Sequence, residues 1–189
     1  MKTLAALAIA TLAATAVPVG AQTSGEAARF TAMAVNMERG ASGTIEIVVN
    51  RWSTEAERTR FLTTLAEQGP EKLVDVLQDT PRVGFMRSPG NLGYDLRYAH
   101  RVKGPDGGER VVVATDRPIG FWEAANRPRS IDYPFTVIEL RLNSDGEGEG
   151  KMSFATKITV DSDAKILTLE NYDTQPVLLQ SVRSSRVTQ

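Results

Sequence analysis

Apolar and polar residues alternate along most of the chain that follows Glu26. The runs 44–49 and 94–102 are the clearest, because both carry β-branched or aromatic residues at alternate positions and both adjoin glycine-containing turns. Similar runs recur between short polar turns over 30–37, 110–116, 135–143, 151–160, 166–172 and 177–182, with another that starts at Val83. The pattern predicts about nine strands, and the tight turns between most neighbours favour antiparallel pairing.

The period changes to a helical one between residues 54 and 79. Thr54 and Glu57 form a capping-box pattern, and apolar residues then recur at helical spacing. Gly69-Pro70 predicts the end of one helix and the beginning of a second, which ends before Pro81. We therefore expect a helical hairpin over residues 54–79 that covers an open end or one face of the sheet.

These elements predict one mainly β domain of the α+β class over residues 22–189, since no linker or repeat divides the chain. Evenly spaced strands are typical of a single antiparallel barrel or a strongly curved sheet of about nine strands, here with one inserted helical hairpin. We favour a barrel that resembles the lipocalin-like architectures. A two-sheet β-sandwich is the alternative, because alternation is common to both.

The first 21 residues have the three parts of a secretory signal peptide. Lys2 supplies the positive charge, Leu4–Val17 is an uncharged apolar run, and Val19-Gly20-Ala21 offers small residues for cleavage. We expect cleavage near Ala21 and a mature protein in the periplasm or outside the cell. No later segment reads as long and apolar enough to span a bilayer, so we expect no membrane span after cleavage.

Composition narrows the chemistry that the chain can perform. It has no cysteine, a single histidine (His100) and a net charge of −1. These counts exclude thiol catalysis and thiolate or histidine-rich metal sites, and a near-neutral chain has no strong attraction to nucleic acid. The acidic segments 145–149 and 161–163 fit hairpin turns better than calcium loops. We therefore expect no metal, no cofactor and no nucleic-acid partner.

The connection 116–134 is much longer than a hairpin between two strands needs, and long loops in compact domains are often functional. Its aromatic rings, arginines and carboxylates suit a sugar, a small acid or a peptide. The competing interpretation is an internally ion-paired cap in which Trp122 closes one end of the β-core. The candidate ligand-binding residues are Asp116, Arg117, Trp122, Glu123, Arg127, Arg129, Asp132 and Tyr133.

Strict alternation assigns the side chains of each predicted strand to two faces. In the strand 94–102, the apolar face comprises Leu96, Tyr98, His100 and Val102, and the polar face comprises Asp95, Arg97 and Arg101. Polar faces of this kind form either cross-strand ion pairs in solvent or the lining of a polar barrel lumen. We favour ion pairs, and we then expect Ile138, Leu140 and Leu142 to be buried against the helices. We interpret His100 as a half-buried residue near a strand end, not as a catalytic base.

Four segments carry a resemblance to other proteins: Arg51-Trp52-Ser53-Thr54, Ala114-Thr115-Asp116-Arg117-Pro118, Asp132-Tyr133-Pro134-Phe135-Thr136 and Leu169-Glu170-Asn171-Tyr172. Together they resemble a group of small exported bacterial proteins that have no assigned activity. The resemblance spans most of the mature chain. It implies that the four segments belong to one domain, and it assigns no activity to any residue.

Three functions remain open on the sequence alone. The first is a non-enzymatic exported domain that binds a small-molecule ligand or another envelope protein at the 115–133 loop. The second is a small metal-free hydrolase or isomerase that uses arginines and the carboxylates of Glu123 and Asp132 in the same loop. The third is a structural interaction domain, which an exposed apolar patch or an unpaired edge strand would indicate.

Overall fold

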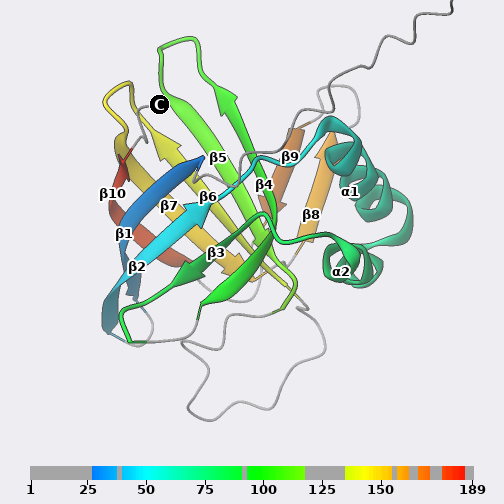
Figure 1. Cartoon of the computed structure of the whole chain (residues 1–189), viewed down its shortest axis with the longest axis horizontal. Helices are drawn as coiled ribbons and strands as arrows, with labels where there is room; N and C mark the ends of the chain where they lie inside the picture. The colour runs from blue at the N-terminus through cyan, green and yellow to red at the C-terminus, as the bar shows by residue number, and fades with distance from the viewer. Residues whose placement is uncertain are drawn as a thin grey trace, which may run out of the picture.

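The computed structural model describes residues 27–37, 40–90, 93–117, 135–154, 157–161, 166–170 and 176–185. It confirms a mainly β protein with one helical hairpin, and neither described helix is long and apolar enough to cross a membrane (Figure 1). The helices are α1 (Glu55–Gln68) and α2 (Pro70–Asp79). The strands are β1 (Ala28–Asn36), β2 (Ala41–Val49), β3 (Gly84–Arg87), β4 (Tyr94–Lys103), β5 (Glu109–Thr115), β6 (Thr136–Leu142), β7 (Glu147–Phe154), β8 (Lys157–Asp161), β9 (Ile166–Glu170) and β10 (Val177–Ser185).

Eight of these strands close into an antiparallel barrel in the order β1-β10-β7-β6-β5-β4-β3-β2. The predicted barrel is therefore confirmed, and the sandwich alternative is wrong. The run 151–160, which we expected to be one strand, contains parts of two. Its first part belongs to β7 in the barrel, whereas its second part is β8, which pairs only with β9 in a separate two-stranded sheet beside α1 (Figure 1).

The barrel interior is packed with apolar side chains contributed by alternate residues of all eight strands. Phe30, Ile45, Leu96, Ile138 and Leu140 are each at most 1% exposed. An eight-stranded barrel is just wide enough for its own side chains to fill it. The alternative in which the polar strand faces line a lumen is therefore wrong, and those faces lie on the outside of the barrel.

A β-bulge in β4 changes which side chains face inward. The pairing of β4 with β5 shifts between Leu96 and Tyr98, and both Leu96 and Ala99 are fully buried in the interior cluster. Because the bulge adds one residue, Tyr98 and His100 point outward instead of sharing the face of Leu96. The expectation of one shared apolar face was wrong for this reason. Arg101 also leaves the face of Arg97, and its guanidinium lies 4.8 Å from the centroid of the Trp52 ring.

The segment between β2 and α1 holds the bulge in place. Ser53 donates its backbone N–H to the carbonyl of Ala99 at 2.8 Å, and its hydroxyl accepts the N–H of Ala99 at 3.1 Å. The next residue, Thr54, is the N-cap of α1 and forms the predicted capping box with Glu57. Arg51 adds a bidentate ion pair to Glu57, with both N···O distances at 2.9 Å. One short segment thus fixes both the register of β4 and the start of the helical hairpin.

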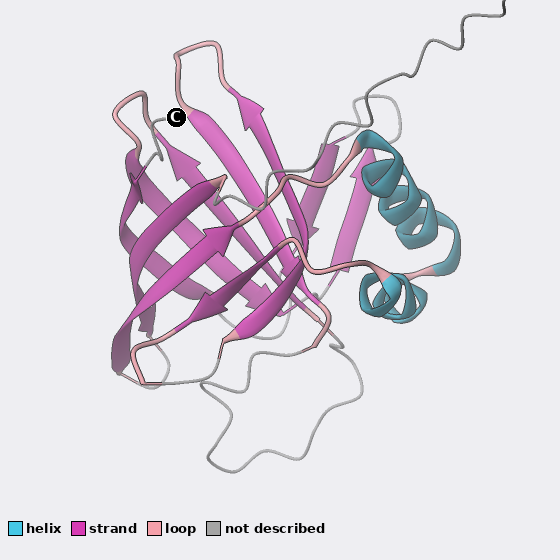
Figure 2. Ribbon diagram, in the orientation of Figure 1, coloured by secondary structure: helices cyan, strands magenta, loops and turns pink. Residues whose placement is uncertain are grey.

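The helical hairpin lies against the outside of the barrel over β4, β5 and β6 (Figure 2). Phe61 and Leu65 from α1 and Leu73 and Leu77 from α2 are buried there against Ala114, Phe135 and Val137. Each of β5 and β6 therefore has apolar side chains on both faces. We expected Ile138, Leu140 and Leu142 beneath the helices; they fill the barrel interior instead, and Val137 on the opposite face of β6 meets the hairpin.

Candidate functional site

Most of the predicted site in the 116–134 loop lies outside the described residues. That part includes Trp122, Glu123, Arg127, Arg129, Asp132 and Tyr133, and the signal peptide over residues 1–21 lies outside as well. The loop site and export therefore stay predictions. The structure places only the two first candidates, Asp116 and Arg117.

Asp116 and Arg117 anchor the start of the loop to the barrel. The carboxylate of Asp116 accepts a hydrogen bond from Arg97 Nε at 2.9 Å, and the same guanidinium donates to the carbonyl of Thr80 at 3.1 Å. The Arg117 guanidinium lies 5.2 Å from the centroid of the Tyr94 ring. These contacts join the ends of α2, β4 and β5. They give Asp116 a structural partner that the sequence did not identify.

The outer strand faces carry the ion pairs that the alternation predicts. Glu139 on β6 accepts from Arg110 Nε on β5 at 2.8 Å and from Arg141 Nε at 2.9 Å. Burial opposes ionisation of Glu139, but the hydrogen bonds and charges of Arg141 and Arg110 outweigh it and lower its pKa. On β4, Asp95 lies 3.4 Å from both Arg82 and Arg97. Cross-strand ion pairs on the solvated face are thus confirmed.

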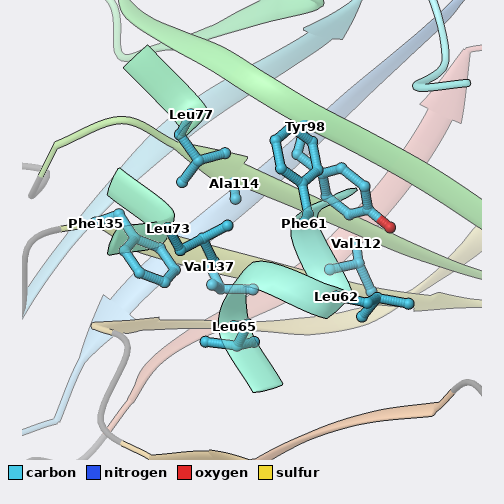
Figure 3. Close-up of a pocket in the computed structure, with 10 residues that line it drawn as sticks. All are labelled: Phe61, Leu62, Leu65, Leu73, Leu77, Tyr98, Val112, Ala114, Phe135 and Val137. Carbon is cyan, nitrogen blue, oxygen red and sulfur yellow. The ribbon is translucent and has the colours of Figure 1, made fainter. Parts of the chain in front are cut away.

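The clearest concave feature of the described residues lies between the helical hairpin and the outer face of β4–β6. Its inner part, which we call the slot, is a cavity of about 40 Å³ with an almost entirely apolar lining. Figure 3 shows side chains from the helices and from the barrel converging on it. The lining comprises Phe61, Leu62, Leu65, Leu73, Leu77, Tyr98, Val112, Ala114, Phe135 and Val137.

A larger and more polar depression, which we call the groove, adjoins the slot. The groove has a volume of about 470 Å³ and shares Leu62, Tyr98 and Val112 with the slot. Arg58 of α1 borders it on the side of the helices, and the β4–β5 hairpin borders it on the opposite side. Val102, which is 53% exposed, adds an apolar surface to its floor. The slot and the groove thus lie side by side, and charged and polar side chains line only the groove, apart from Tyr98, which lines both.

Tyr98 lies at the junction between the slot and the groove. Its ring packs edge-on against Phe61, with the centroids 5.2 Å apart, and stacks with the ring of His100 at 6.3 Å. Burial raises the pKa of Tyr98 to about 12, although the charge of Arg58 and a hydrogen bond to it oppose the rise. The phenol therefore stays protonated at neutral pH. It can exchange hydrogen bonds with Arg58 and with a ligand, but it is not a base or a nucleophile there.

His100 lies in the groove next to Tyr98 and Arg58. Burial lowers the pKa of His100, and the positive charge of Arg58 lowers it further, while Glu55 acts in the opposite direction. The imidazole is consequently neutral at pH 7 and offers one hydrogen-bond donor and one acceptor. The expectation of a half-buried histidine on β4 is confirmed, but this histidine faces a depression that the sequence did not reveal.

The charged groups around the groove are nearly balanced. Four basic side chains and two acidic ones line it: Arg58, Lys103, Arg110, Arg141, Asp106 and Glu109. Two further carboxylates bond to these cations, since Glu55 pairs with Arg58 and Glu139 pairs with Arg110 and Arg141. Over the described part of the chain, no three metal-ligating side chains gather closely enough to hold an ion.

Sequence reasoning missed this site because its two walls are far apart along the chain. Arg58 and Leu62 lie one helical turn apart on α1, and Tyr98 and His100 lie on alternate positions of β4, so each pair shares a face. Neither spacing predicts that α1 packs against β4. The only local signal was the polar pair at 98 and 100 within an otherwise apolar pattern.

No protein-family model, characterised protein or solved structure matches the chain, so its function is inferred from the slot and the groove.

Proposed function

We propose that this protein is an exported, non-enzymatic binding domain for a small amphipathic molecule, held in the groove with its apolar end in the slot. The adjacency of the two cavities carries the proposal. They share Leu62, Tyr98 and Val112, and we propose that a single ligand spans both. The signal-peptide pattern of residues 1–21 supports the exported location.

The size and lining of the site fit binding of this kind. Small-molecule sites have volumes of roughly 300 to 1,000 Å³, are mostly apolar, and carry a few polar groups that orient the ligand. The groove, at about 470 Å³, lies within that range, and Arg58, His100 and Tyr98 supply the polar groups. The slot, at about 40 Å³, accepts a few apolar atoms, for which its lining offers almost no competing polar contact.

The polar groups of the groove are suited to binding a ligand. His100 is neutral; its ring stacks with that of Tyr98, and the charges of Arg58 and Glu55 act on it in opposite directions. Tyr98 stays protonated because its pKa is about 12, and a guanidinium is not deprotonated at neutral pH. Tyr98 and Arg58 can therefore orient a ligand without taking a proton from it, and in this proposal the neutral His100 contributes a hydrogen-bond donor and an acceptor.

A dye titration with two matched variants tests the proposal. The probe is 1-anilinonaphthalene-8-sulfonate, whose fluorescence rises in apolar sites. Ala114→Val adds two methyl groups to the slot lining, and we expect it to weaken dye binding about tenfold. Ala41→Val makes the same change at the start of β2, away from the slot, and should leave the affinity unchanged. Urea midpoints of both variants show that neither has become partly unfolded, a state that also binds the dye.

The same titration distinguishes this site from the predicted loop site. If Ala114→Val and Ala41→Val bind the dye equally well, the slot is not used and the proposal is wrong. A loss of binding in Trp122→Phe with full retention in Ala114→Val would place the ligand at the 115–133 loop instead. Loss in Ala114→Val alone supports the slot and the groove.

A further inference from the structure

We propose that the ligand of the groove carries an uncharged hydrogen-bond acceptor, such as a carbonyl oxygen, about three carbon atoms from its apolar end. The acceptor binds the hydroxyl of Tyr98, and the short apolar end fills the slot. This inference rests on the proposed function, because it names the chemical class of the ligand for the same site.

The slot lining offers a ligand a single polar side-chain atom. Nine of the ten lining residues are apolar, and the tenth is Tyr98, whose hydroxyl oxygen is that atom. In Figure 3 this hydroxyl points away from Leu77, towards the side on which Leu62 and Val112 lie. Leu62 and Val112 are the other two residues that the slot shares with the groove. A hydrogen bond to Tyr98 therefore fixes a ligand at the junction of the two cavities.

The Tyr98 hydroxyl keeps its proton available for the ligand. Its hydrogen-bond partner among the described residues is Arg58. A guanidinium has donors and no acceptor, so the phenol oxygen accepts this bond and its own proton can be donated elsewhere. Phe61 packs edge-on against the Tyr98 ring and His100 stacks on it, which holds the ring in place before a ligand binds. A donor held in this way selects ligands that carry an acceptor at the matching position.

The surroundings of Tyr98 favour an uncharged acceptor over an ionised one. Arg58 lies 3.4 Å from Glu55, hydrogen-bonds to Tyr98 and makes a further interaction, so its charge has partners within the chain. An ionised ligand group at Tyr98 would lose hydration beside the apolar lining and gain one hydrogen bond in exchange. Burying such a charge costs far more than burying a carbonyl group that is hydrogen-bonded. A ketone, ester or amide oxygen therefore suits this position better than a carboxylate.

The volume of the slot sets the distance between the acceptor and the apolar end of the ligand. A cavity needs about 10 to 15 Å³ to hold one group of the size of a water molecule. The slot, at about 40 Å³, therefore holds about three such groups, which corresponds to a propyl end. The rest of the ligand lies in the groove, which is much larger, at about 470 Å³.

Isomeric ketones test the position of the acceptor. The probes are 4-decanone, which has a propyl group beside its carbonyl, and 2-decanone, which has a methyl group there. 2-Decanone must either leave most of the slot empty or move its carbonyl away from Tyr98. Displacement of 1-anilinonaphthalene-8-sulfonate should therefore show that 4-decanone binds about fivefold more tightly. Equal affinities would overturn the inference, and so would tighter binding of decanoate than of 4-decanone.

Two matched variants on β4 test the hydrogen bond. Tyr98→Phe removes the hydroxyl, so it should weaken 4-decanone binding about fivefold and abolish the preference over 2-decanone. The infrared C=O stretching band of bound 4-decanone should also move to higher frequency, because the hydrogen bond is lost. Tyr94→Phe makes the same change at a residue that lines neither the slot nor the groove, and it should alter none of these values. Equal results for the two variants would refute the role of Tyr98.

The dye titration separates this inference from the proposed function. If neither ketone displaces the dye while Ala114→Val still weakens dye binding, the proposed function stands and the carbonyl acceptor is refuted. If Ala114→Val leaves dye binding unchanged, the proposed function fails and this inference fails with it. The comparison of the two ketones uses the unsubstituted protein, so it decides the inference even if Tyr98→Phe proves unstable in urea.

Discussion

Replacing Ser53 with alanine removes one hydrogen-bond acceptor from the centre of the fold. The Ser53 hydroxyl accepts the backbone N–H of Ala99 at 3.1 Å; Ser53 is 8% exposed and Ala99 is fully buried. Water cannot reach the amide once the hydroxyl is gone, so the donor is left without a partner. A buried donor in that state costs about 1 to 3 kcal/mol. We therefore expect Ser53→Ala to lower the free energy of unfolding by that amount.

Urea denaturation followed by circular dichroism measures the effect. With a denaturant dependence of about 2 kcal/mol per molar urea for a domain of this size, the midpoint should fall by about 0.5 to 1.5 M. Hydrogen exchange gives a second readout, because the Ala99 amide should exchange faster than in the unsubstituted protein. Ser42→Ala on exposed β2 is the matched control and should change stability by less than about 0.5 kcal/mol. Equal midpoints for the two variants would refute the reasoning.

Two further predictions concern the outer core and the groove. Leu77 is 1% exposed between α2 and the barrel. Leu77→Ala should therefore lower the free energy of unfolding by about 2 to 5 kcal/mol. A shift of the melting temperature no larger than that of a surface substitution would contradict this prediction. Because the pKa of His100 is lower in the folded chain than its ordinary value of 6.5, the unfolded chain binds the proton more readily. The free energy of unfolding should therefore fall as the pH drops below about 6.5. Urea titrations at pH 7.5 and 5.5 should show a smaller pH dependence for His100→Gln than for the unsubstituted protein. An identical pH dependence in both proteins would refute the lowered pKa of His100.

The strands and helices could be predicted because their signals are local. Alternation in 44–49 and the Thr54–Glu57 capping box each depend on a few neighbouring residues, and the structure confirms both elements. The helical hairpin at 54–79 was likewise correct. Barrel closure was preferred over a sandwich from the number of strands, and the structure decides in its favour.

The errors arose where a distant segment changes the local pattern. The bulge in β4 depends on Ser53, which lies 46 positions before Ala99 in the chain, so the alternation around Leu96 gave no sign of it. The run 151–160 keeps its alternation across two strands that belong to different sheets. The groove needs α1 on top of β4, and neither element alone encodes that contact. The predicted residues of the 116–134 loop stay untested, apart from the anchoring of Asp116 and Arg117.

The burial of β5 on both faces has a consequence for how the chain reaches its folded state. Val111 and Val113 face the barrel interior while Ala114 lies beneath the helices, and residues 111–115 include no charged side chain. Before the hairpin docks, this strand presents an apolar, β-branched stretch of the kind that pairs between molecules and aggregates. Arg110 and Asp116 at its two ends act as charged gatekeepers. The helical hairpin thus covers the outer apolar face of β5. A chain that lacks residues 54–79 would therefore aggregate instead of forming a barrel whose outer face is exposed there.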